Sequence, residues 1–251
     1  MFGRRGVRSS AGDGVHGAPV SRLVRRLLIA LAVLALLVVG ADRVGVRTAQ
    51  YAAAKTLQAS EGLAKRPTVT IHGLPFLTQL ANGRLDHVSV VATGVPLGTG
   101  GRTVVLARLD VDLHNVTVKN NFTQVHVASG SATGLIPYSE LSREVGATIR
   151  YVGAGSGGGR VEAARAVRLS GRSVEATVGA QVSTLNGVLH FVGLTAEYAG
   201  APASVQSQLR HALGTRLPLN RVPFGLRVQS VQALASGIEF TLAGTNLTFR
   251  R

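Results

Sequence analysis

Two pairs of acidic residues are the side chains in this sequence best placed for acid–base chemistry. Asp110 and Asp112 alternate along a predicted strand, so both carboxylates lie on one side of it and could hold a cation. Glu140 and Glu144 lie on neighbouring turns of a predicted helix, with Arg143 beside them. A solvated helix face is the plainer interpretation of the glutamates, and a lone Asp-x-Asp is a weak signal. We therefore predict neither catalytic residues nor a metal site.

The histidines and the glycine-rich segment do not predict a metal or nucleotide site either. The histidines fall in separate predicted elements without an H-E-x-x-H motif or a close pair, so we expect polar strand residues. They include His72, His87, His114, His126, His190 and His211. Residues 153–158 fit G-x-G-x-x-G, but a dinucleotide site needs a helix to begin at the last glycine, and an alternating strand follows instead. We expect a flexible hairpin loop over residues 153–159 and no cofactor.

Alternating apolar and polar residues predict strands through much of the sequence. The pattern runs through residues 105–114, 124–128, 174–182, 226–228 and 238–242. Turn sequences separate these runs, at residues 98–101, 153–159, 171–173, 186–187 and 243–246. Burial on one face of each strand is typical of antiparallel sheets.

Three predicted helices interrupt the strands. They cover residues 43–64, a segment that starts at Pro137 with Leu141 and Val145 on one face, and residues 203–213. The expected fold class is α+β, with a long, strongly curved antiparallel sheet and a few packed helices. Because three helices leave part of the apolar face uncovered, that surface can close as a barrel, dimerise or hold an apolar ligand such as an acyl chain.

The N-terminal segment is typical of export or membrane anchoring. Six arginines lie within residues 1–26, and an uncharged apolar run of 15 residues follows at 27–41 and ends before Asp42. The run is short for a full span but can continue as helix, while Val39-Gly40-Ala41 offers a cleavage site. We predict a basic cytoplasmic tail (1–26), a signal anchor or signal-peptide core (27–41) and an exported domain (42–251). The protein is then a single-pass membrane protein with its C-terminal domain outside the cytoplasm, or is exported after cleavage near Ala41.

Composition narrows the class of partner. The chain of 251 residues carries a net charge of +15 and has no cysteine, which excludes thiolate chemistry and disulfides. Outside a membrane, a basic surface favours anionic phospholipid headgroups or anionic glycans. Aromatic residues, which commonly stack on nucleic-acid bases, are few, so we predict no nucleic-acid partner.

Four local motifs, in this order, resemble one known family. They are Gly73-Leu74-Pro75-Phe76-Leu77 with Gly83-Arg84-Leu85, Pro137-Tyr138-Ser139-Glu140-Leu141, Gly171-Arg172-Ser173-Val174, and Val222-Pro223-Phe224-Gly225-Leu226-Arg227-Val228. Together with the N-terminal anchor and an Ala-rich helix, they resemble the LmeA-like phospholipid-binding family of actinobacterial cell-envelope proteins. The resemblance covers about residues 42–250.

The resemblance implies an elongated, tubular lipid-binding fold similar to that of the bactericidal/permeability-increasing (BPI) protein group. It also implies phospholipid binding and, in some members, a role in lipoglycan maturation. The apolar residues of these motifs and their neighbours become candidate lipid contacts, although ordinary core packing explains them equally well. They are Leu74, Phe76, Leu77, Leu80, Tyr138, Leu141, Phe224 and Leu226. Arg84, Arg221 and Arg227 are candidates for pairing with a lipid phosphate.

Three functional hypotheses follow. The leading one is a non-enzymatic, membrane-tethered protein that holds or transfers a phospholipid in an apolar groove. The second is an envelope enzyme or enzyme accessory acting on a lipid-linked glycan, with Asp110 and Asp112 or Glu140 and Glu144 as its acid–base pair. The third is a structural envelope protein that binds anionic polymers through charge, which predicts an affinity that falls steeply with salt.

Overall fold

The computed structural model divides into two compact units, Met1–Ala41 and Asp42–Arg251. It describes residues 22–99, 102–119, 124–155, 158–169, 172–185, 188–196 and 225–250, together with 207, 211, 217 and 218. The helix predicted over residues 203–213 therefore lies almost wholly outside the described residues.

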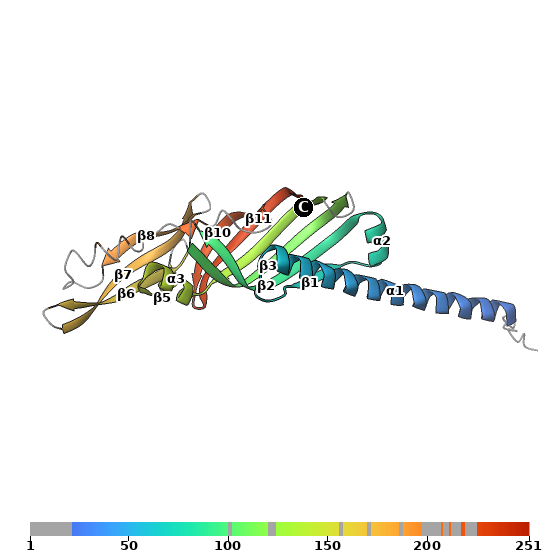
Figure 1. Ribbon diagram of the computed structural model, residues 1–251, viewed down its shortest axis with the longest axis horizontal. Coiled ribbons are helices and arrows are strands. Elements are labelled where there is room, and N and C mark those ends of the chain that lie inside the picture. Colours follow the sequence, from blue (N-terminus) through green and yellow to red (C-terminus); the bar gives the residue numbers. More distant parts are fainter. Residues whose placement is uncertain are drawn as a thin grey trace, which may run out of the picture. The chain divides into compact units, whose positions relative to one another are not determined.

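Helix α1 (Arg22–Ser60) is continuous through the apolar run and the predicted helix that follows it (Figure 1). Its segment Leu28–Ser60 is long and apolar enough to cross a membrane, and the apolar side chains of the run, such as Leu36 and Leu37, are exposed. This helix is compatible with a membrane anchor or a signal sequence.

The far end of α1 turns the chain onto a sheet. Gly62 has a left-handed φ of 61°, and the Leu63 N–H donates to the Gln58 carbonyl over 3.0 Å. These features are typical of a Schellman C-cap, in which glycine accepts the left-handed conformation and the next residue packs back against the helix. Leu63 is accordingly buried in the main apolar cluster.

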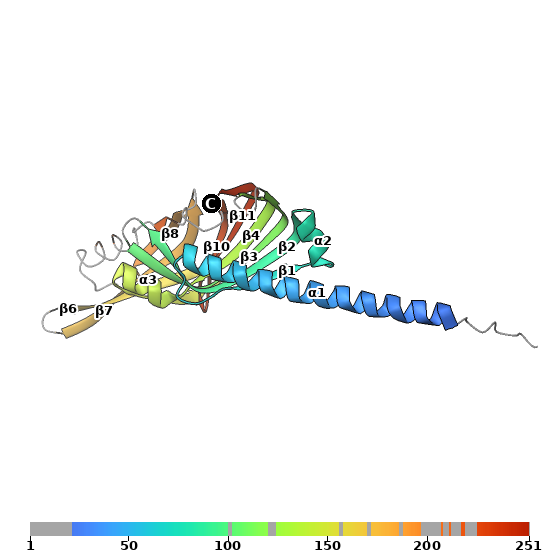
Figure 2. The same ribbon diagram turned by 45° about the vertical axis from the view of Figure 1, so that its right-hand side comes forward.

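The described strands form two antiparallel sheets. The first has the order β1-β2-β3-β4-β11-β10, and Figure 2 shows it as a twisted layer of long strands. Its strands are β1 (Thr68–His72), β2 (Arg84–Thr99), β3 (Arg102–Lys119), β4 (Gln124–Ile136), β10 (Arg227–Leu234) and β11 (Gly237–Arg250). The second has the order β5-β6-β7-β8-β9. Its strands are β5 (Thr148–Gly153), β6 (Arg160–Leu169), β7 (Arg172–Leu185), β8 (Val188–Ala196) and β9 (Leu217–Pro218).

The predicted α+β class and the antiparallel pairing are confirmed, but the expectation of one long sheet is not met among the described strands. Pro137 follows β4 directly and precedes helix α3 (Tyr138–Val145), which ends at Gly146 in a left-handed conformation. Because proline has no N–H to donate, it cannot continue the strand ladder. The chain leaves the first sheet here, builds the second, and returns only with β10 and β11.

The inner face of the first sheet carries the main core. Cross-strand partners Val88 and Leu113, Val90 and Val111, and Ala92 and Leu109 are all buried on this face. On the neighbouring strands, Gly134 of β4 lies opposite Phe240 of β11, whose ring occupies the space that a side chain at position 134 would need. From α1, Ala54 and Leu57 pack into the same cluster.

The glycine-rich segment forms the predicted β5–β6 hairpin, and its last two glycines also bridge the two sheets. The Gly158 carbonyl accepts a hydrogen bond from the Ala233 N–H of β10 over 2.6 Å, and the Gly159 carbonyl accepts one from the Val182 N–H of β7 over 3.2 Å. Gly159 has a φ of 86°, and a Cβ there would lie 2.8 Å from the Ala233 carbonyl oxygen. Only glycine fits this position without displacing the backbone.

We expect Gly159→Ala to destabilise the protein more than Gly193→Ala. Gly193 also has a left-handed φ, of 62°, but a Cβ there would meet no atom within 4 Å. The control, Gly193→Ala, should therefore lower the free energy of unfolding by only about 1–2 kcal/mol, the penalty for a left-handed alanine. Gly159→Ala should lower it further, because its Cβ also clashes with the Ala233 carbonyl. Urea unfolding of both variants measures the difference, and equal losses would show that the bridge adds nothing.

Candidate functional site

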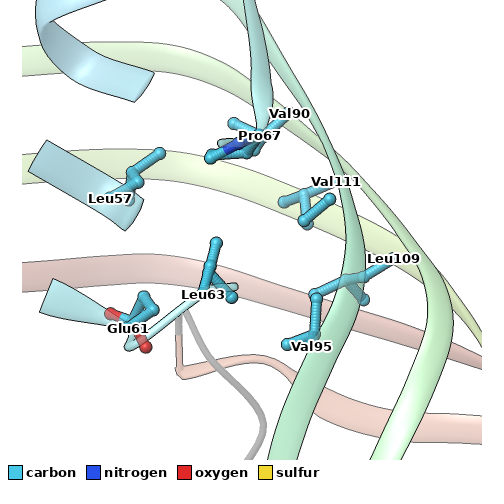
Figure 3. A pocket seen from close by; sticks show the side chains of 9 residues that line it. Leu57, Glu61, Leu63, Pro67, Val90, Val95, Leu109 and Val111 are labelled. Atoms are coloured by element: carbon cyan, nitrogen blue, oxygen red, sulfur yellow. The ribbon is translucent and has the colours of Figure 1, made fainter. Parts of the chain in front are cut away.

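An apolar cavity lies between the end of α1 and the inner face of the first sheet (Figure 3). Its floor is built from β2 and β3, and its roof from Leu57 and the α1–β1 connection. The full lining is Leu57, Glu61, Leu63, Pro67, Val90, Ala92, Val95, Leu109 and Val111. The floor exists because the apolar residues of β2 and β3 alternate with polar ones and pair directly across the two strands.

The chemistry of this cavity suits an apolar ligand. Its free volume is only about 20 Å³, enough for about one water molecule, and Glu61 is the charged residue of its lining. Pockets for small molecules usually measure about 300–1,000 Å³, so this cavity is too small for an acyl chain unless its walls move apart. Aliphatic walls favour an alkyl chain by about 0.8 kcal/mol for each methylene removed from water.

The candidate acid–base residues lie elsewhere and are engaged by neighbours. Asp110 and Asp112 are on the opposite, outer face of β3. Arg108 donates two hydrogen bonds of 2.6 Å to Asp110, which raise the pKa of Arg108, and Asp112 lies 2.9 Å from the His87 ring nitrogen Nε2. Within the part of the chain that the structure describes, no group of three or more potential ligand side chains is arranged to hold a metal ion.

Glu140 ties α3 to the first sheet. Its carboxylate accepts a hydrogen bond from the Val105 N–H of β3 over 3.0 Å and pairs with Arg143. Glu144, on the next turn, is half-buried. The expectation that these glutamates form a solvated helix face is therefore wrong for Glu140, because its contact with β3 joins two elements that the sequence does not show to be neighbours.

Three histidines gather on the outer face, contrary to the expectation that they do not cluster. His72, His87 and His114 lie directly opposite one another on β1, β2 and β3. Their rings stack with centroids 4.3 and 4.4 Å apart and interplanar angles of 12° and 14°. The sequence hides this row because only the strand register brings these residues together. Parallel stacked rings do not direct their nitrogens at a common point, so the row is not arranged to chelate a metal.

The predicted lipid-contact residues occupy several environments. Phe76, Leu141 and Leu226 are buried, Leu80 and Tyr138 are half-buried, and Leu74 and Leu77 are exposed. Arg84 and Arg227 are exposed, and Phe224 and Arg221 lie outside the described residues. None of the described members lines the cavity of Figure 3. The cavity floor comes from the predicted run 105–114 and from residues 88–92, which alternate in the same way but were not among the predicted strands.

Helix α2 (Phe76–Ala81) is attached to α1 through the first of the family-like motifs. Pro75 precedes α2 and provides no side-chain cap, and the Leu77 N–H donates to Asp42 Oδ1 over 2.7 Å. A carboxylate is stabilising at a helix N-terminus, where backbone N–H groups lack partners. Gly45 allows close approach, since a Cβ there would lie 3.2 Å from Leu77 Cδ2 and 3.7 Å from Phe76 Cδ1.

Fold and site together define an α+β protein with an apolar cavity between a helix and an antiparallel sheet. The family model described as LmeA-like phospholipid-binding matches residues 40–243. The chain belongs to this family, as its four motifs predicted, and membership indicates phospholipid binding. No curated protein and no solved structure matches the chain.

We expect Asp42→Ala to loosen α2, because it removes the acceptor for the Leu77 N–H. Hydrogen exchange at Leu77 and the following amides of α2 should become faster than in the unmodified chain. Asp42→Asn is the matched control, since its amide oxygen can still accept the bond. Unchanged exchange in Asp42→Ala would show that the contact does not hold α2.

We expect Tyr138 to contribute a stability term that is lost at high pH. Burial raises the pKa of its hydroxyl to about 12, and this hydroxyl donates to the Leu234 carbonyl over 2.7 Å. The folded pKa lies above the ordinary value of about 10, so the term is complete below pH 10 and disappears as the pH rises towards 12. The stability difference between the unmodified chain and Tyr138→Phe should therefore shrink over this interval, as measured by urea unfolding. A constant difference would contradict the assignment.

Proposed function

We propose that this protein is a non-enzymatic phospholipid-binding protein of the cell envelope, anchored by α1 with its C-terminal domain outside the cytoplasm. The observation that carries the proposal is the apolar cavity under the end of α1, in a chain that belongs to a phospholipid-binding family. An acyl chain would lie along the inner face of β2 and β3, beneath Leu57 and Leu63. Cleavage near Ala41 would release the same domain without its anchor.

The cavity is small for a whole lipid tail, so binding would require the roof to move. Leu57 and Leu63 sit at the end of a helix and in a short connection, whereas the floor belongs to the centre of a sheet. Segments at helix ends and in loops open at lower free energy than central strands. A lipid would thus enter by displacing the roof and replace its contacts with those of the acyl chain.

The finer features of the proposal rest on charge and on the family. The net charge of +15 favours an anionic headgroup, which exposed arginines such as Arg84 and Arg227 can meet, with Arg221 as a further candidate. The proposal also includes a tubular, BPI-like architecture, the holding or transfer of a lipid, and support of lipoglycan maturation.

The alternative of an enzyme acting on a lipid-linked glycan is weaker, because Asp110 is paired with Arg108 and Asp112 with His87.

The proposal is tested by filling the cavity. Val90 faces it, whereas its neighbour Val91 lies on the opposite face of the same strand. We expect native mass spectrometry of the full chain and of Val91→Phe to show a stoichiometric phospholipid, and Val90→Phe to lose it. Overpacking costs about 1–3 kcal/mol, so thermal unfolding must first show that both variants are folded. An unmodified chain that stays empty in the presence of lipid, or equal lipid binding by the two variants, would contradict the proposal.

A further inference from the structure

Leu74, just before α2, and Leu77, in its first turn, are exposed, although Phe76 between them is buried. Leu74 has 64% of its surface exposed and Leu77 41%, whereas Phe76 has 2%. Val44 of α1 is likewise 65% exposed. Phe76 is thus sufficient to pack the segment against the domain, and the leucines contribute apolar surface that the fold leaves in contact with solvent.

The position of these leucines is fixed by α1. Asp42 is 4% exposed and accepts the Leu77 N–H, and the Leu77 side chain lies beside Gly45. The segment therefore cannot move far from the turn of α1 formed by residues 42–45. A buried charged hydrogen bond of this kind is costly to break, which makes the attachment firm.

Asp42 is also the first charged residue after the apolar run of α1. Because the apolar run of 15 residues is short for a full span, Asp42 of an anchored chain lies no further out than the membrane–water interface. Gly45 lies three residues further along the helix, at a rise of about 4.5 Å. The headgroup layer is about 5–7 Å thick on each side of the bilayer, so a segment held at Gly45 lies within it.

The exposed charges of α1 at the height of this segment have the sign that a lipid surface requires. Arg43 and Arg47 are exposed on the side of α1 opposite Gly45, because two residues correspond to about 200° of helix, whereas the exposed Asp86 lies beside Gly73. Basic residues next to exposed apolar side chains are the combination by which proteins bind anionic membrane surfaces.

We propose that Leu74 and Leu77, with Val44, Arg43 and Arg47, form a membrane-contact surface that enters the headgroup layer of the bilayer. The inference rests on the membrane-anchored role proposed above. The contact would hold the domain against the bilayer from which a phospholipid is taken, with Asp42 setting its depth. The occupant is an anionic phospholipid bilayer, and a second copy of the chain is the outcome that the test must distinguish.

The absence of cysteine from the sequence allows a direct test by labelling. The full chain, as Leu74→Cys or Leu77→Cys, would carry an environment-sensitive fluorophore and be reconstituted in phosphatidylcholine vesicles containing phosphatidylglycerol. Val152→Cys is the control, because Val152 is 50% exposed and belongs to β5 of the second sheet. We expect a blue-shifted emission at Leu74 and Leu77 and loss of fluorescence with lipids that carry a quencher near the headgroup, and neither effect at Val152.

Emission from Leu74 and Leu77 that matches the Val152 control would overturn the inference. So would a blue shift that depends on protein density and is insensitive to quencher lipids, which would assign the surface to a second copy of the chain. Lipid retained by the same samples after extraction into detergent is measured by mass spectrometry. If the protein retains lipid but the labels at positions 74 and 77 are not quenched, this inference alone is contradicted. If those labels are quenched but the protein retains no lipid, the proposed function alone is contradicted.

Discussion

The structure depends on one constraint, which is that the apolar face of a six-stranded sheet must be kept from water by very little covering structure. Val90, Leu109, Val111 and their neighbours form a continuous apolar surface on β2 and β3. Among the described residues, the last turns of α1 and the connection through Leu63 provide the cover over this part of the face. The Gly62 cap is essential to that cover, because it directs Leu63 back onto the sheet.

The core is filled differently beneath β4 and β11 than beneath β2 and β3, and the cavity results from that difference. On β4 and β11, glycine opposite a large ring leaves no space, as at Gly134 and Phe240. On β2 and β3 the facing side chains are short aliphatic ones, and the cover is a helix end rather than another strand. Such a site can exchange protein contacts for those of an alkyl chain with little loss, because both are apolar.

The sequence predicted elements better than it predicted contacts. Alternation located parts of β3, β4, β7, β10 and β11, and Pro137 located the start of α3, because both signals are local, but the long strand β2 was not predicted. The stack of His72, His87 and His114 depends on strand register, and the bond between Asp42 and Leu77 joins residues 35 positions apart. The division into two sheets and the bridge at Gly159 likewise depend on which strands meet, which no local pattern encodes.

The candidate site shows the same limit. The motifs that identified the family contain Phe76 and Leu141, which are core residues attaching α2 and α3, while the cavity is lined by ordinary alternating strand residues. A family motif thus identified the class of ligand, and the residues that would hold it emerged only from the packing of α1 on β2 and β3.

The most direct test of the account is photocrosslinking with a phospholipid that carries a diazirine in its acyl chain. The full chain in detergent would be loaded with this lipid, irradiated and digested, and the modified residues located by mass spectrometry. The account predicts modification of the α1–β1 segment near Leu57 and Leu63 and of the inner residues of β2 and β3. Modification confined to the apolar run of α1 before Asp42, or to the outer face of the sheet, would contradict it.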